Sequence, residues 1–290
     1  EIGGGFRIPD MLRQAGARLR EVGATNRCRI EDYEAAYRAG GVGAILKVHR
    51  SNFRISGFTE EVELDELAAW AREREVPLLY DLGSGLLVEP ARLGLPPEPR
   101  PQEAIDQGAD LVVFSADKLL GGPQAGLVVG GAQAVESLRR HPLCRAFRVD
   151  KATLAALEAT LRLYRDPEGA LGRIPVLRSL ALGREAVRSR CESLAGELGA
   201  RVSGRASIST GEREGRVGGG TYPEHALASW GVAVRPANGN LDGFARLLRS
   251  GAVPVVGRVE DEAWWMDPRA VEPEDDGLLL DAVEGALPEG

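Results

Sequence analysis

Residues 114–126 read FSADKLLGGPQAG, an apolar stretch followed by a lysine and then by a glycine-rich turn. The apolar run 111–114 is typical of a strand buried on both faces, so Lys118 is expected just beyond a strand end. The chain has only three lysines, at positions 47, 118 and 151, among 36 basic residues. Arginine stays protonated, whereas a desolvated lysine can act as a nucleophile. The stretch therefore predicts a sheet with a reactive lysine at one strand end.

Composition limits the class of protein. A chain of 290 residues with 43% hydrophobic content can form one large domain or two smaller ones. No segment approaches the roughly 18 apolar residues of a membrane span, and no charged-then-apolar signal segment opens the chain. The net charge of −7 argues against nucleic-acid binding by the whole surface, although it leaves room for a local arginine patch. Because the chain starts EIGGG without a methionine, we expect a processed or partial sequence.

The cysteines and histidines predict neither disulfides nor a metal site. The three cysteines are widely spaced and odd in number, which favours free thiols in a reducing cytosol. The three histidines are too scattered for a zinc cluster.

Strands and helices alternate over the first two-thirds of the chain, which is typical of an α/β layered fold. In this part the sequence predicts strands at 44–49, 77–81, 110–115 and 126–130 and helices at 31–39, 63–74, 132–140 and 150–164. Further on it predicts helices at 174–198, 241–248 and 274–287 and strands at 201–209, 231–235 and 253–259. We therefore expect a large domain over residues 1–165, with 150–165 as a linking helix, and a small α+β domain over 166–290.

A carboxylate stands at the end of another predicted strand. Asp81 is followed by the glycine turn LGSG, and this position points into the crevice where α/β sheets bind ligands. In a pyridoxal phosphate enzyme such an aspartate keeps the pyridine nitrogen protonated, so that the ring can withdraw electrons. Lys118 would then bind the cofactor covalently. The alternatives are an aspartate that caps a turn and a surface lysine.

Three further residues are candidates for cofactor binding. Ser115 lies three residues before Lys118 and could donate its hydroxyl to a phosphate. Asn52 follows the strand predicted at 44–49 and could bind the phenolic oxygen of the cofactor, or it could form a turn. His49 could contact the cofactor ring or be a satisfied histidine at a strand end.

Two arginines could bind an oxyanion. Arg145 and Arg148 are three residues apart, so in a helical turn they would share a face and could clamp a phosphate. In a chain so rich in arginine, a solvated helix face is the structural alternative.

These motifs together resemble bacterial selenocysteine synthases, the L-seryl-tRNA(Sec) selenium transferases. The resemblance rests on EIGGGFRIPD (1–10), EVGATNR (21–27), KVHRSNF (47–53), DLGSG (81–85), FSADKLLGGPQAG (114–126), HPLCRAFR (141–148) and DKATLAALEATL (150–161). It extends more weakly to VGGG (217–220) and PVVGR (254–258). It thus covers nearly the whole chain.

The resemblance implies a fold and a set of roles. The fold would be the aspartate-aminotransferase-like fold type I of pyridoxal phosphate enzymes, with a smaller C-terminal α+β domain. Lys118 matches the lysine that binds the cofactor, and Asp81 lies where the partner of the pyridine nitrogen is expected. Asp117 resembles a carboxylate implicated in the active site. Arg145 and Arg148 match arginines thought to bind the phosphate of the selenium donor.

One departure from the family is large. Family members have a long N-terminal portion before the motif that opens this chain, including a tRNA-binding domain and the first part of the cofactor domain. The large domain is therefore expected to be incomplete at its N-terminus. We expect the chain alone to bind cofactor poorly and to be inactive or incompletely folded. The family also implies a homo-oligomer, a ring of dimers, in the cytoplasm.

The implied chemistry is β-replacement on serine esterified to tRNA(Sec). Lys118 would take the α-proton as general base, the β-hydroxyl would leave with the help of an acid, and selenophosphate held by Arg145 and Arg148 would add selenium. Asp117 is a candidate for that acid or for its orienting group, and the sequence leaves the choice open.

Two alternatives stay open. A related pyridoxal phosphate lyase or β-eliminase, acting on a small amino or sugar acid, would share Asp81 and Lys118. The arginine pair and the 150–161 helix favour the transferase. A fragment that serves as an inactive scaffold is the other alternative.

Overall fold

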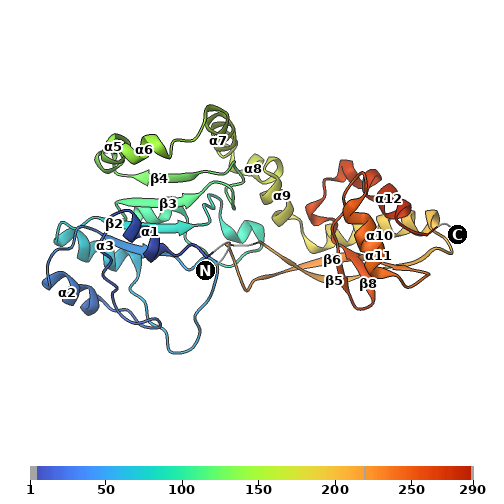
Figure 1. Cartoon of the computed structure of the whole chain (residues 1–290), viewed down its shortest axis with the longest axis horizontal. Coiled ribbons are helices and arrows are strands. Elements are labelled where there is room, and N and C mark those ends of the chain that lie inside the picture. The colour runs from blue at the N-terminus through green and yellow to red at the C-terminus, as the bar shows by residue number, and fades with distance from the viewer. Residues whose placement is uncertain (1–4, 219, 289–290) are drawn as a thin grey trace. The chain divides into compact units, whose positions relative to one another are not determined.

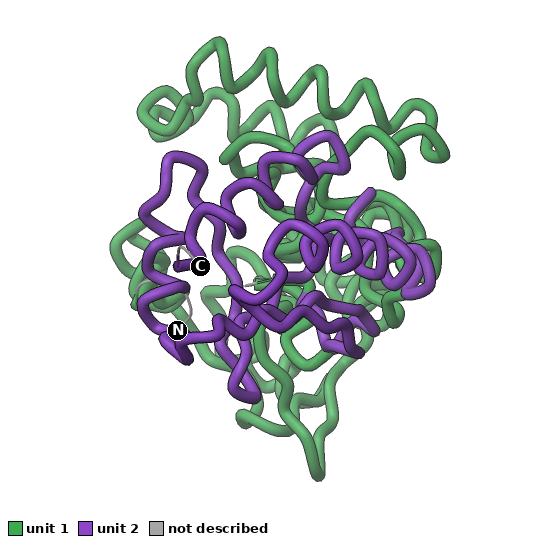
Figure 2. The backbone as a smooth tube through the Cα atoms, turned by 90° about the vertical axis from the view of Figure 1, so that its right-hand side faces the viewer, with its two compact units in different colours: residues 1–177, 217–225 green, residues 178–216, 226–290 purple. Residues whose placement is uncertain are grey.

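The computed structural model describes residues 5–218 and 220–288. Residues 1–4 of the first resemblance motif and Gly219 of the VGGG motif lie outside the described residues. The chain divides into two compact units, residues 1–177 with 217–225 and residues 178–216 with 226–290 (Figure 2). The loop between two strands of the second unit thus belongs to the first. The domain boundary expected at residue 165 stays a prediction.

The first unit is built on a four-stranded sheet of order β1-β2-β3-β4 (Figure 1). Its strands are β1 (Ile45–Val48), β2 (Leu78–Gly83), β3 (Leu111–Ser115) and β4 (Gly126–Gly130). β1, β2 and β3 are parallel and β4 runs antiparallel to β3. The carboxyl ends of the parallel strands therefore meet at one edge of the sheet, where ligands bind in α/β proteins. All four strands were predicted from the sequence.

The two faces of this sheet differ in burial. Along β2, Leu78, Tyr80 and Leu82 are buried and belong to a core that includes Leu67 and Ala71 of the helix α3 (Leu64–Glu73). We call this side the core face. Asp81 points to the opposite side, because successive strand residues alternate.

Asp81 pairs in register with Val48 and Val113, and Val113 pairs with Val128. We call this side the Asp81 face. Val48 and Val128, at its two edges, are 36% and 40% exposed. The Asp81 face is therefore much more open than the core face.

The helices of the first unit are those the alternating pattern predicted, with short additions. They are α1 (Ile8–Gln14), α2 (Ile30–Arg38), α3 (Leu64–Glu73), α4 (Pro101–Asp106), α5 (Ala132–Arg140), α6 (Pro142–Ala146), α7 (Lys151–Leu163) and α8 (Pro167–Arg173), and η1 (Pro90–Leu93) is a single 3₁₀ turn. α7 begins where Asp150 Oδ1 accepts a hydrogen bond from the Thr153 amide at 2.9 Å. Just beyond its end, the Tyr164 hydroxyl donates to the Leu120 carbonyl at 2.8 Å. α7 is thereby tied to the turn that follows Lys118.

The second unit has an antiparallel sheet of order β5-β6-β8-β7. Its strands are β5 (Ala206–Arg216), β6 (Ala226–Pro236), β7 (Arg258–Glu260) and β8 (Ala263–Met266). α10 (Arg184–Arg201), α11 (Leu241–Ser250) and α12 (Asp276–Gly285) share a core with it, and η2 (Pro268–Ala270) and η3 (Pro273–Asp275) precede α12. Arg269 lies in this unit and donates to the Ser179, Leu182 and Ala228 carbonyls.

Several boundaries expected in this part were wrong. The single helix at 174–198 is two helices, α9 (Pro175–Ala181) and α10, because Gly183 is extended. The strand at 201–209 begins only at Ala206, since α10 continues to Arg201. The strand at 253–259 is reduced to β7, and β8 was not predicted. No helix among residues 5–218 and 220–288 is both long and apolar enough to cross a membrane.

Candidate functional site

Lys118 lies in the turn directly after β3 and is half-buried. Two backbone hydrogen bonds fix this turn. The Leu119 amide donates to the Ser84 carbonyl at 3.1 Å, and the Gly121 amide donates to the Lys118 carbonyl at 3.0 Å. Leu119 and Leu120 are fully buried behind the lysine. The local packing therefore anchors the backbone on both sides of Lys118.

Asp81 and Lys118 are brought together at the carboxyl ends of neighbouring strands. Burial raises the pKa of the Asp81 carboxyl, and the Lys118 ammonium acts in the opposite direction. An amine and a carboxylate that influence each other in a partly desolvated crevice are typical of a functional site. Asp81 and Lys118 therefore lie close enough to influence each other electrostatically, and their roles toward a cofactor stay predictions.

Glycines bring the backbone close to the lysine from two directions. A Cβ added to Gly220 would lie 3.1 Å from both Cε and Nζ of Lys118. A Cβ on Gly83 would lie 2.9 Å from Ser51 Oγ and 3.8 Å from Lys118 Nζ. Both glycines have positive φ, at +82° and +81°, which a side chain would strain. The space around the lysine amine thus depends on residues without side chains.

His49, Asn52 and Ser115 lie at the same edge of the sheet. The His49 amide donates to the Asp81 carbonyl at 2.8 Å, and burial lowers the pKa of the His49 imidazole. Ser115 ends β3 on the Asp81 face, opposite Gly126 of β4. Asn52 is half-buried next to the buried Ser51. Their roles toward a cofactor stay predictions.

Glu98 is a residue of this site that the sequence reading missed. Its side chain is 6% exposed, and Oε1 lies 3.9 Å from His49 Nε2. Burial raises the pKa of the Glu98 carboxyl, and the Lys118 ammonium opposes that rise. Glu98 sits in a loop rich in prolines at 96, 97, 99 and 101. The prolines mark a loop, but nothing local in the sequence indicates that this loop returns to the strand ends.

The other predicted residues lie apart from these contacts. Asp117 is exposed, although it is adjacent to Lys118. Arg145 lies in α6 and Arg148 follows its end, because the helix stops at Ala146. The two arginines therefore do not share a helical face as expected. Both are exposed, and neither makes a hydrogen bond or ion pair with another described residue.

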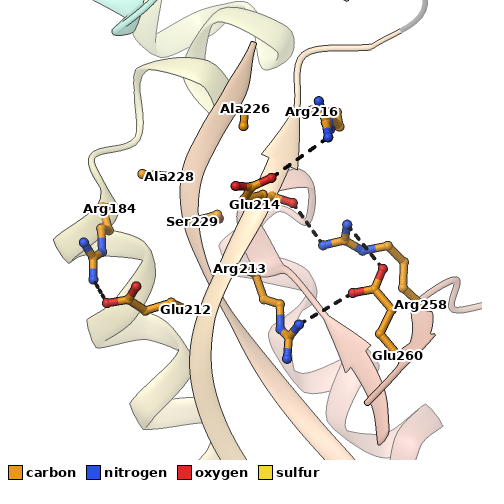
Figure 3. A pocket seen from close by; sticks show the side chains of 10 residues that line it. All are labelled: Arg184, Glu212, Arg213, Glu214, Arg216, Ala226, Ala228, Ser229, Arg258 and Glu260. Atoms are coloured by element: carbon orange, nitrogen blue, oxygen red, sulfur yellow. Dashed lines mark hydrogen bonds and ion pairs between the residues drawn. The ribbon is translucent and has the colours of Figure 1, made fainter. Parts of the chain in front are cut away.

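A cavity of about 590 Å³ lies in the second unit instead (Figure 3). It is lined by Arg184, Glu212, Arg213, Glu214, Arg216, Ala226, Ala228, Ser229, Arg258 and Glu260. Arginines and glutamates pair around it, as in Arg184 with Glu212 and Arg213 with Glu260. Because its arginines are already neutralised by glutamates, the cavity offers little attraction for an anion. None of the predicted site residues lines it.

Comparison with known proteins places the chain in one family. Residues 1–272 match the family model described as "SelA: L-seryl-tRNA selenium transferase". Among curated proteins, the L-seryl-tRNA(Sec) selenium transferase of Solidesulfovibrio magneticus is 49% identical over 285 residues, which are 98% of this chain and 60% of that protein. The enzyme of the same name from Desulfotalea psychrophila is 46% identical over 96% of this chain and 60% of its own length. The chain thus spans about three-fifths of the length of these relatives.

Among solved structures, that of D-glucosaminate-6-phosphate ammonia-lyase matches with a TM-score of 0.57 at 18% identity, over 96% of this chain and 66% of that one. At this identity the likeness concerns the fold alone. The predicted fold class, the α/β fold of fold type I, is confirmed. The chain belongs to the L-seryl-tRNA selenium transferase family.

Proposed function

We propose that the protein converts seryl-tRNA(Sec) to selenocysteinyl-tRNA(Sec) with selenophosphate as the selenium donor. The observation that carries the proposal is the meeting of Lys118 and Asp81 at the strand ends of a chain in this family. Family membership supports the overall reaction. The Lys118 amine and the Asp81 carboxylate are the groups that its first steps require.

Pyridoxal 5′-phosphate is the cofactor of this chemistry, and the residues fit it. Lys118 would hold the cofactor through its amine, and Asp81 would lie beside the pyridine nitrogen. Gly83 and Gly220 leave room next to the lysine amine. Ser84 Oγ and Thr221 Oγ1 are buried without a hydrogen-bonding partner among the described residues, as expected where a polar ligand completes the site. When bound, the cofactor supplies an electron sink for the carbon next to the amino group.

Lys118 has a second task in the reaction. Its amine removes the α-proton of the seryl group, because it lies at the reacting carbon once the substrate amine has taken its place. Asp81 supports that step by keeping negative charge near the ring nitrogen, in a crevice where burial strengthens electrostatic effects.

Binding of the donor would use the unpaired arginines. Arg145 and Arg148 are exposed and without partners in the described chain, so their charges are available to a phosphate group. The acidic net charge of −7 favours a small local clamp over a broad basic surface for this ligand. We infer that tRNA contacts lie mainly elsewhere in the enzyme, that a ring of dimers is the working assembly and that it is cytoplasmic.

The lysine assignment is tested by Lys118→Ala, with Lys151→Ala as the matched control. Lys151 is an exposed lysine at the start of α7. We expect Lys118→Ala to lose the visible absorbance of protein-bound cofactor and to reduce selenium transfer by more than about 10³-fold, since one residue serves as both cofactor anchor and base. Lys151→Ala should keep both. An unchanged absorbance in Lys118→Ala would mean that the lysine assignment is wrong.

The donor clamp is tested by the double variant Arg145→Ala/Arg148→Ala. It should keep cofactor absorbance and bind seryl-tRNA(Sec), yet fail to incorporate selenium from selenophosphate. Arg139→Ala/Arg140→Ala, two exposed arginines of α5 already paired with Glu136, is the control. Normal selenium transfer in Arg145→Ala/Arg148→Ala would show that these two arginines do not bind the selenium donor. Elimination without selenium donor use would point instead to a lyase.

A further inference from the structure

Glu98 is a deeply buried carboxyl group on which the charge of Lys118 acts. Its side chain is 6% exposed, and Oε1 is buried without a hydrogen-bonding partner among the described residues. A buried polar atom left without a partner destabilises the folded state. Such an atom beside a reactive lysine is explained if a ligand supplies the missing partner.

The loop that carries Glu98 is fixed on both sides. Two residues before it, the Pro96 carbonyl accepts a hydrogen bond from the Tyr222 hydroxyl at 3.0 Å. Two residues after it, Arg100 contacts Glu89 at 2.8 Å and Glu103 at 2.6 Å. The flanking prolines restrict the backbone further. Glu98 is therefore held in place before any ligand binds, as a catalytic group must be.

Two other buried oxygens lie in segments that meet near the lysine. Ser84 follows the Gly83 turn, and its carbonyl accepts the Leu119 amide. Thr221 follows Gly220, which lies against Lys118 Nζ. Like Glu98 Oε1, Ser84 Oγ and Thr221 Oγ1 lack partners within the described part of the chain. Each of these oxygens is thus available to a ligand that offers a hydrogen-bonding group such as a hydroxyl.

We propose that Glu98 is the general acid that protonates the departing β-hydroxyl oxygen of the seryl group, a role that rests on the proposed function. Lys118 Nζ takes the α-proton, and that electron pair becomes the second bond between Cα and Cβ. The Cβ–O bond breaks, its electron pair stays on oxygen, and oxygen takes the Glu98 proton to leave as water. Lys118 then returns its proton to Glu98, so both groups regain their starting states.

The electrostatics suit this order of events. Burial raises the pKa of Glu98, which favours the protonated form that a general acid needs. The Lys118 ammonium lowers that pKa, so capture of the α-proton promotes release of the Glu98 proton. Burial lowers the pKa of the neighbouring His49 imidazole and raises the pKa values of the Tyr80 and Tyr222 phenols. Asp117 is exposed and Asp81 belongs to the ring nitrogen, which leaves Glu98 as the acid.

The test compares leaving groups in Glu98→Gln. Departure of hydroxide needs a proton, whereas departure of chloride does not. With seryl-tRNA(Sec), Glu98→Gln should lose about 10²–10⁴-fold in turnover. With β-chloroalanyl-tRNA(Sec), it should stay within about threefold of wild type on the same reasoning. Glu66→Gln, an exposed glutamate of α3 outside the Glu98 loop, should leave both substrates unaffected.

A second readout is independent of turnover. The pKa of Glu98 is higher in the folded state than its ordinary value of 4.5 in the unfolded state. Above pH 4.5 the folded protein therefore binds more protons than the unfolded protein, and wild-type stability falls as the pH rises. The unfolding temperature of Glu98→Gln should therefore increase relative to wild type from pH 4 to pH 8. Asp81 is common to both proteins and cancels in this difference.

The outcomes separate the two hypotheses. Equal losses with both substrates, or no loss with either, would overturn the acid role while leaving the proposed function intact. A difference in unfolding temperature that does not vary with pH would also overturn it, because a protonated buried acid would then be absent. A wild-type enzyme that forms no selenocysteinyl-tRNA would overturn the proposed function and the acid role with it.

Discussion

The two faces of the first sheet are built from alternate residues of the same strands, yet they serve different ends. The core face is completely buried at Leu78 and Leu82. The Asp81 face, one residue away along β2, is half-open and carries a carboxylate whose pKa is raised. Folding free energy therefore comes mainly from one side of the sheet, and the reactive groups stand on the other side or at its edge. Neighbouring substitutions should separate stability from activity.

The largest effect is expected on the core face. Leu82→Ala removes a fully buried side chain next to Asp81 and should lower the free energy of unfolding by about 2–5 kcal/mol, since a cavity is left in the core. Denaturant titration of the purified protein measures this loss. Leu79→Ala, on the partly exposed face of the same strand, is the control and should cost less. Equal losses at positions 79 and 82 would contradict the assignment of the two faces.

Asp81→Asn should give the opposite result. We expect a loss of about 10²–10³-fold in selenium transfer, comparable with removal of one preorganised electrostatic group. Stability above the ordinary pKa of 3.8 should not fall and should rise slightly, because the substitution removes a buried charge. Steady-state turnover and thermal unfolding on the same samples check both statements. If Asp81→Asn instead lowered the unfolding temperature strongly and kept full activity, Asp81 would contribute to stability and not to catalysis, contrary to the assignment of the two faces.

The smallest effect concerns the turn that follows Lys118. Tyr164→Phe removes the hydrogen bond to the Leu120 carbonyl but keeps the ring, so it should cost about 1 kcal/mol of stability. Hydrogen exchange should increase in the turn at 119–122 and stay constant in β2. Exchange that is unchanged in that turn would show that Tyr164 does not hold it.

The sequence predicted the part of the fold that has strong local periodicity. The strands around Asp81 and Lys118 have continuous apolar runs, and their order follows from the alternation of strands and helices. β5 was predicted with the wrong bounds because 211–216 reads GEREGR, in which polar residues and glycines hide a strand paired along its whole length with β6. The Gly183 break was missed because the apolar residues on either side keep a helical spacing.

For the site, the sequence identified the groups that follow strands. Asp81 and Lys118 could be predicted to lie near each other because parallel strands bring their carboxyl ends to one edge, and their catalytic roles stay predictions. Glu98 and Gly220 come from loops, and which strand end a loop approaches depends on tertiary packing. Arg145 and Arg148 depend on the resemblance, and the structure adds their exposure and lack of partners.

The first unit is discontinuous in sequence, because it contains residues 217–225 while the segments on either side of them belong to the second unit. During synthesis, Gly220 and Tyr222 emerge roughly a hundred residues after Lys118, a delay of about 5–20 s at ordinary elongation rates. The contact of Gly220 with the Lys118 side chain and the hydrogen bond from Tyr222 to the Pro96 carbonyl therefore form late, after most of the chain has been synthesised. A nascent or prematurely terminated chain would carry Lys118 without these contacts, which delays the reactive site until the rest of the protein can fold.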